Sequence, residues 1–202
     1  GIMPSIRRRT VDWNDSRLKG TQPIGVDGAI AGGFQSKWLF NVGVGAYYST
    51  NKYYVGVSLP RILKNNIDFS EVGSIISKEV HHAYLMTGLL VNVNDKIKLQ
   101  PQILVKYAQN SPLDFDLNLM GIFMEKFNAG LTYRAGGSKE TGIGESLDVL
   151  VGAQLTRNLM FGLSYDITLS EVKNYSNGSI EAILRYCLGK SEGKEYINPR
   201  FF

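Results

Sequence analysis

The chain has 202 residues, and its 22 Lys and Arg against 18 Asp and Glu leave a net charge of only +4. Charges of both signs are interspersed, without the basic stripe that indicates a nucleic-acid-binding surface. The single cysteine, Cys187, excludes an internal disulfide framework and a multi-cysteine metal site.

The composition favours β-structure, because 11 Tyr, nine Phe and 22 Gly accompany only six Pro. No apolar run is long enough for a transmembrane helix. A transmembrane β-barrel would also have this modest hydropathy, because half of each strand faces the lumen.

Alternating apolar and polar residues predict about ten strands. The stretch 1–11 alternates poorly and is interpreted as the outer end of a strand. Clear alternation follows in nine further stretches: 35–48, 53–59, 83–93, 96–107, 113–122, 125–134, 146–155, 159–169 and 180–188.

The connections alternate in length. Short turns are expected near 49–52, 94–95, 123–124 and 156–157, with a short loop at 108–112. The longer loops are 12–34, 60–82, 135–145 and 170–178, and residues 70–78 are compatible with a helical turn. Short turns at one end and long loops at the other are typical of an outer-membrane barrel.

The two faces of the strands differ in charge. One face carries almost no charge, whereas the other is rich in Gly, Asn, Gln and Ser and carries the predicted lumen charges: Lys98, Lys106, Asp114, Asp116, Lys126, Arg134, Asp148, Asp166, Glu181 and Arg185. We expect Asp114 and Asp116 to form interstrand ion pairs with Lys126 and Arg134. A soluble barrel or sandwich would have the same period with the charged face outside, so alternation alone leaves both open.

Strand length and aromatic placement favour the membrane. Strands of about ten residues cross a bilayer at the usual tilt. Aromatic residues gather near the short turns and the outer strand ends, as interfacial girdles do: Tyr47, Tyr48, Tyr53, Tyr54, Phe123, Phe127, Trp38, Tyr107, Tyr133 and Tyr165. The prediction is an all-β, antiparallel transmembrane barrel.

Two segments carry a family resemblance. FNVGVGAYYSTNKYYVGVSLPRIL resembles the signature hairpin of the PorP/SprF family of type IX secretion and gliding-motility membrane proteins of Bacteroidetes. FGLSYDITLSEVKNYSNGSIEAILRYCLG with NPRFF is similar to that family's C-terminal hairpin and tail, and GIMPSIRRRTVDWNDSRL is like the strand and loop ahead of the signature hairpin.

The resemblance implies a barrel of about fourteen strands, of which this chain would be the C-terminal part, with the N-terminal strands missing. Residues 1–188 would then form part of the barrel, and residues 189–202 a periplasmic tail. It further implies a location in the outer membrane, in contact with its lipid.

The function implied by the resemblance is non-enzymatic. The barrel would anchor or support export of a surface adhesin through the adhesin's type B C-terminal domain, and could also meet periplasmic machinery proteins. The candidate partner contacts are Tyr175, Asn177, Asn198, Arg200 and Phe201. The alternative is an outer-membrane channel for small solutes, lined by the lumen charges.

An enzyme is the least supported class. His81 and His82 are adjacent, which suits a polar loop better than a zinc site. The serines lack the GxSxG nucleophile elbow, and Cys187 suits a passive position in the barrel wall. We therefore expect no catalytic residue, no metal and no cofactor; a lipase or protease barrel would have to use the histidine pair.

Overall fold

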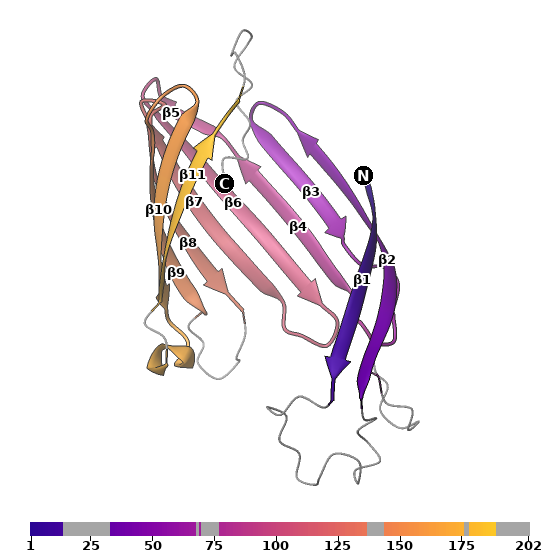
Figure 1. Ribbon diagram of the computed structural model, residues 1–202. Helices are drawn as coiled ribbons and strands as arrows, with labels where there is room; N and C mark the ends of the chain where they lie inside the picture. The colour runs from indigo at the N-terminus through magenta and orange to yellow at the C-terminus, as the bar shows by residue number, and fades with distance from the viewer. Residues whose placement is uncertain (14–32, 68, 70–76, 137–143, 176–177, 189–202) are drawn as a thin grey trace. The chain divides into compact units, whose positions relative to one another are not determined.

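The computed structural model describes residues 1–13, 33–67, 69, 77–136, 144–175 and 178–188. Eleven strands and one short 3-10 helix make up the regular structure of these residues (Figure 1). The strands are β1 (Ile2–Asp12), β2 (Phe34–Ser49), β3 (Tyr53–Leu59), β4 (His82–Leu89), β5 (Val91–Asn94), β6 (Ile97–Ala108), β7 (Asp114–Phe123), β8 (Phe127–Ala135), β9 (Ser146–Gln154), β10 (Leu159–Thr168) and β11 (Ser179–Tyr186). The 3-10 helix η1 (Glu171–Asn174) lies in the connection between β10 and β11, where the sequence predicted only a polar loop.

The strands pair in the order β1-β2-β3-β4-β6-β7-β8-β9-β10-β11, with β5 beside β6. Neighbours are consecutive in the chain, except that β4 lies beside β6 and not beside β5. The pairs with a defined register are antiparallel, so the predicted all-β antiparallel class is confirmed. Among the described residues, no helix is long and apolar enough to cross a membrane.

The stretch 83–93 was predicted as one strand and is instead two. Leu90 lies outside both β4 and β5, and its backbone N–H donates to the carbonyl of Lys52 at 2.6 Å. After this break β5 pairs only with β6, and the register shifts between Asn92 and Asn94. Alternation continues through Leu90, which explains why the pattern alone predicted ten strands.

The chain divides into two compact units, which we describe separately. Unit 1 contains residues 1–45 and 58–83, and unit 2 contains residues 46–57 and 84–202. The predicted division between barrel and tail at residue 188 borders the undescribed residues 189–202 and stays a prediction. The helical turn predicted at 70–78 also lies mostly outside the described residues.

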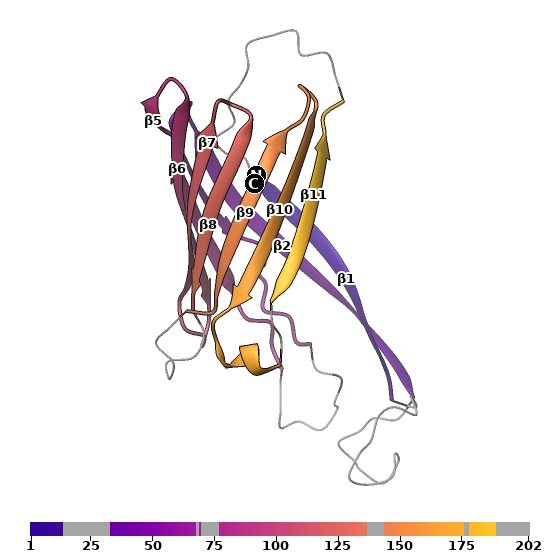
Figure 2. The same cartoon turned by 90° about the vertical axis from the view of Figure 1, so that its left-hand side faces the viewer.

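In unit 2, β6 to β11 lie side by side (Figure 2), and their two faces differ in exposure. Apolar side chains occupy the exposed face; Leu119 and Val151, for example, are 51% and 52% exposed. The opposite face is shielded, and Met120 and Gln100 on it are each 1% exposed. This distribution is the reverse of a water-soluble protein, where the apolar face is the covered one.

In unit 1, β1 pairs with β2 along its whole length, from Ile2 opposite Val44 to Asp12 opposite Phe34. Ile6 and Phe40 lie on an exposed apolar face, whereas Leu39 and Asn41 are buried on the other. Because successive residues of a strand point to opposite faces, Arg7 and Arg8 lie on different sides of this pair.

One part of the predicted aromatic girdle is wrong. Tyr54 is buried, its ring packs against Tyr47 with centroids 5.9 Å apart, and a Cβ on Gly88 would lie 2.6 Å from it. Tyr48 and Tyr53 are exposed instead, with ring centroids 6.1 Å apart. The two tyrosine pairs of this hairpin therefore occupy opposite faces, as the pleat requires.

Candidate functional site

A network of charged side chains crosses the shielded face of unit 2, from β6 to β10. The Nζ of Lys106 lies 2.8 Å from the Oδ2 of Asp116, and the Nε of Arg134 lies 3.7 Å from the Oδ1 of the same aspartate. Arg134 also contacts Asp148, with Nη2 3.2 Å from Oδ2, and Asp166, with Nη1 3.7 Å from Oδ2. We call these five residues the charge ladder.

Strand register produces the ladder. Asp116 lies directly opposite Arg134 across β7 and β8, and Asp148 lies directly opposite Asp166 across β9 and β10. Like charges that face each other in a sheet repel, so the two aspartates need a cation between them. Arg134 lies within ion-pair distance of both, because its guanidinium presents several donors in a fixed plane.

The other predicted lumen residues take different positions. Lys98 forms an ion pair with Glu125, 2.6 Å away, and Asp114 lies opposite Lys106 in register. Lys126 precedes β8 and lies in the turn, so the expected pairing of Asp114 or Asp116 with Lys126 is wrong. Glu181 and Arg185 lie on β11, opposite Ser164 and Met160, and are exposed.

Only one of the five predicted partner contacts lies in the described chain. Tyr175 follows η1 and is 94% exposed, which is the largest exposure of any hydrophobic residue described. Asn177, Asn198, Arg200 and Phe201 lie outside the described residues.

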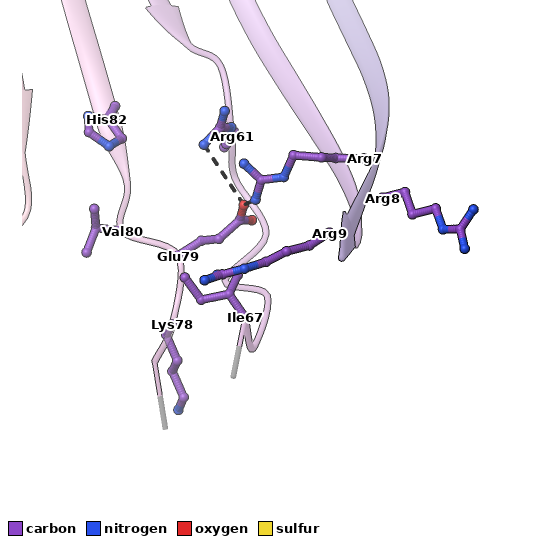
Figure 3. A pocket seen from close by; sticks show the side chains of 9 residues that line it. All are labelled: Arg7, Arg8, Arg9, Arg61, Ile67, Lys78, Glu79, Val80 and His82. Atoms are coloured by element: carbon purple, nitrogen blue, oxygen red, sulfur yellow. Dashed lines mark hydrogen bonds and ion pairs between the residues drawn. The ribbon is translucent and has the colours of Figure 1, made fainter. Parts of the chain in front are cut away.

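A second site, in unit 1, was not predicted. It is a cavity of about 370 Å³ next to β1, and we call it the basic pocket (Figure 3). Its lining consists of Arg7, Arg8, Arg9, Arg61, Ile67, Lys78, Glu79, Val80 and His82. The side chains of Arg7 and Arg61 converge on the carboxylate of Glu79, whereas Arg8 points away (Figure 3).

Buried hydrogen bonds fix Glu79 in this pocket. Its Oε2 accepts from the Nδ2 of Asn41 at 3.0 Å and from the Nδ2 of Asn65 at 2.9 Å. Its Oε1 accepts from Arg7 and lies 3.9 Å from the Nη1 of Arg61. Glu79 is only 8% exposed, and a buried carboxylate needs this number of donors to stay charged.

Asn41 also holds the segment that follows β3. Its Oδ1 accepts from the backbone N–H groups of Val42, Ile62 and Leu63 at 2.9 to 3.0 Å, and its Nδ2 donates to the carbonyl of Leu63 at 2.9 Å. A side-chain amide that satisfies backbone groups in this way substitutes for a missing strand partner. The carboxamide therefore joins β2 to the wall of the basic pocket.

The local environment lowers the pKa of Glu79 below its usual value. Burial alone would raise the pKa, because it disfavours the charged form. The hydrogen bonds from Asn65 and Asn41 and the charges of Arg7 and Arg61 outweigh burial, and the carboxylate is therefore ionised at neutral pH.

Sequence patterns gave weak signals for this pocket. Asn41 is a polar residue at a shielded position of a strand, and Glu79 is the only acidic residue between 77 and 82. The two are 38 positions apart, however, and only the fold brings them together. The Nε2 of His81 lies 2.8 Å from the carbonyl oxygen of Ile62. No group of three or more His, Cys, Asp or Glu in the described part of the chain could hold a metal ion.

Comparison with known proteins gives one match. The family model described as type IX secretion system membrane protein PorP/SprF matches residues 1–186, which include both the charge ladder and the basic pocket. Comparison with curated proteins and with solved structures gives no match.

Proposed function

The chain belongs to the PorP/SprF family of type IX secretion system membrane proteins, and on this premise we propose that it is a non-enzymatic outer-membrane β-barrel that anchors a surface adhesin. The adhesin's type B C-terminal domain would be held at the end of the barrel that carries the longer connections. Periplasmic proteins of the secretion and gliding machinery are further candidate partners.

The observation that carries the membrane part of the proposal is the exposed apolar face of β7 to β10. Leu119, Leu131, Val151 and Leu163 on this face are all at least 40% exposed. Transferring apolar surface out of water contributes about 25 cal/mol per Å², so lipid contact along several strands is strongly favourable. Apolar residues outside and polar residues inside are the pattern of a transmembrane barrel.

Two of the described strands lie at the edges of the sheet. Among the described strands, β1 pairs only with β2, and β11 pairs only with β10. Unpaired backbone N–H and C=O groups cost several kcal/mol each in a bilayer, as a rough figure, so an open edge would not persist there. We therefore propose that both edges are paired in the membrane.

The connection between β10 and β11 is the first place to look for the adhesin contact. Tyr175 lies there, beside η1, and is exposed; tyrosine is one of the residue types enriched among the buried anchors of protein interfaces. Tyr53 is also an exposed tyrosine, but it lies at the start of β3, directly after a short turn and not in a longer connection. It provides a matched control.

Affinity purification from native outer membranes tests the proposal. Tagged protein should co-purify a type IX adhesin, and Tyr175→Ala should weaken recovery about tenfold if the tyrosine is an interface anchor. Tyr53→Ala should leave recovery unchanged. The anchor proposal is wrong if normally inserted protein retains no adhesin from a strain that displays one.

The second candidate function, a channel for small solutes, is favoured by the ladder. Arg134 is 38% exposed although it contacts three aspartates, so water reaches this face. In known pores, rings of charged side chains in contact with water select the ions that pass. Steady conductance of pure protein in planar bilayers, altered in selectivity by Arg134→Gln, would support the channel; a silent bilayer would leave the anchor as the better account.

A further inference from the structure

The basic pocket of unit 1 has an excess of positive charge. Arg7, Arg9, Arg61 and Lys78 line it together with one carboxylate, Glu79. That carboxylate is already engaged: one oxygen accepts from two asparagines, and the other accepts from Arg7. None of the ion pairs defined among the described residues includes Arg9 or Lys78. The cavity therefore favours an anionic group from outside.

Two of the three β1 arginines that line the pocket lie on the face opposite the exposed apolar face. Arg7 and Arg9 lie opposite Leu39 and Lys37, on the shielded face of β1 and β2. Arg8, one residue along, lies on the other face, with its guanidinium 5.7 Å from the ring centroid of Trp38. Lipid headgroups would meet the apolar face and hence Arg8. A ligand of the basic pocket would come from the aqueous side.

The spacing of the cations, rather than the volume of the cavity, favours a peptide over a small anion. The volume is about 370 Å³, within the range of about 300–1,000 Å³ found for ligand pockets in general. Its cations come from separate segments: Arg9 from β1, Arg61 from the residues after β3, and Lys78 from the residues before β4. Separated charges match several carboxylates along one chain. Arg9 also lies 5.6 Å from the ring centroid of Phe69, which adds an apolar surface.

We propose that the basic pocket binds an acidic segment of a partner protein through the carboxylates of its Asp and Glu side chains. Arg9 and Lys78 make the principal contacts, and Arg61 adds a third. Glu79 does not compete with the ligand; it holds Arg7 and the segment around Asn65 in place. The proposed function supplies a protein partner for this pocket, and in that respect the inference rests on it.

Direct binding to the purified chain in detergent micelles tests this assignment. The probe is a fluorescently labelled peptide of alternating Glu and Ser, and its matched partner has Gln in place of Glu. The double variant Arg9→Gln/Lys78→Gln removes two charges from the pocket. Lys52→Gln/Lys96→Gln removes the same number from exposed turns and serves as the control. Equal unfolding midpoints of the two double variants show that the fold is retained.

The pocket variant should bind the Glu peptide about tenfold more weakly than the parent chain, since each exposed ion pair contributes about threefold. The control should lose less than about twofold, because its charges act only at long range and are screened by salt. Equal losses in both variants, or equal binding of the Glu and Gln peptides, would overturn the proposal.

Two further measurements distinguish binding of an acidic peptide from binding of a lipid or of a small anion. If the pocket variant loses binding to phosphatidylglycerol vesicles while neither peptide binds, the ligand is lipid and the proposal is wrong. If inorganic phosphate binds in the pocket and the Glu peptide does not, the ligand is a small anion and the proposal is again wrong. Peptide binding that depends on Arg9 and Lys78 supports the inference even where no adhesin co-purifies, so the two proposals fail independently.

Discussion

Arg134 on β8 lies directly opposite Asp116 on β7, with its Nε 3.7 Å from the aspartate's Oδ1. The same guanidinium contacts Asp148 and Asp166, so one cation links three carboxylates from three strands. Asp116 in turn binds Lys106, which extends the ladder to β6. The ladder thereby joins strands that are not direct neighbours.

Replacing Arg134 with Met should destabilise the folded protein by about 1–2 kcal/mol, between the values for exposed and buried ion pairs. The substitution leaves Asp148 and Asp166 facing each other without the guanidinium that contacts both. Urea unfolding in lipid vesicles measures the difference. Lys126→Met, in the turn before β8, removes the same charge and should change stability by less than about 0.5 kcal/mol. Equal effects of the two substitutions would contradict a structural role for the ladder.

Placing a charge on the exposed apolar face should prevent or weaken membrane insertion. Leu163 and Ser164 are neighbours on β10, and their side chains point to opposite faces. Leu163→Arg should cost about 2–4 kcal/mol of folding free energy in vesicles near the bilayer midplane. Ser164→Arg, on the shielded face, should be tolerated better. If Ser164→Arg cost more folding free energy than Leu163→Arg, the assignment of lipid to the apolar face of β10 would be wrong.

Acidification should loosen the wall of the basic pocket. Because the pKa of Glu79 is lowered in the folded protein, its contribution is complete above the unfolded-state value of 4.5 and is lost as the pH falls through the lower folded-state value. Hydrogen exchange of residues 62–67, corrected for the intrinsic pH dependence, should therefore accelerate below about pH 4.5. In Glu79→Gln, protection of this segment should be weaker at neutral pH and should not change further on acidification. If residues 62–67 of the parent chain exchange at the same corrected rate at every pH, Glu79 does not stabilise the wall of the pocket.

Gly43 should not tolerate a side chain. A Cβ at this position would lie 2.7 Å from the carbonyl oxygen of Pro60, which is backbone and cannot rotate away. Gly43→Ala should cost about 1–3 kcal/mol and detach the segment after β3 from β2. Gly152→Ala is the less crowded comparison, because a Cβ there would lie 3.3 Å from its nearest neighbour, the carbonyl oxygen of Phe161. Unfolding midpoints of the two variants provide the comparison, and equal midpoints would refute the close approach of Pro60.

Alternation predicted the strands of unit 2 well because each has one apolar and one polar face. The opposition of Asp116 and Arg134 also follows from sequence, since a short hairpin turn fixes the register. The position of that turn was less predictable. Lys126 continues the alternation of β8 but lies in the turn, so its expected pairing fails.

The basic pocket could not be predicted because nothing periodic encodes it. Glu79 meets Asn41 and Arg7 through a segment without strand alternation, held by the isolated bridge between Asn66 and Lys78. Such contacts depend on tertiary structure, whereas strand patterns depend on near neighbours. The break at Leu90 was missed for the same reason, since its partner is the distant carbonyl of Lys52.

The lipid-facing assignment can be measured residue by residue along β10. Cys187 is the chain's only cysteine, so a Cys187→Ser background allows single cysteines to be placed from Phe161 to Asp166 and labelled with a nitroxide. Collision with oxygen, which concentrates in lipid, should alternate with period 2 and peak at Phe161, Leu163 and Tyr165. Collision with a water-soluble nickel complex should peak at the intervening positions. Nickel accessibility that is highest at Leu163, or no alternation at all, would contradict a membrane-spanning β10 and the outer-membrane function built on it.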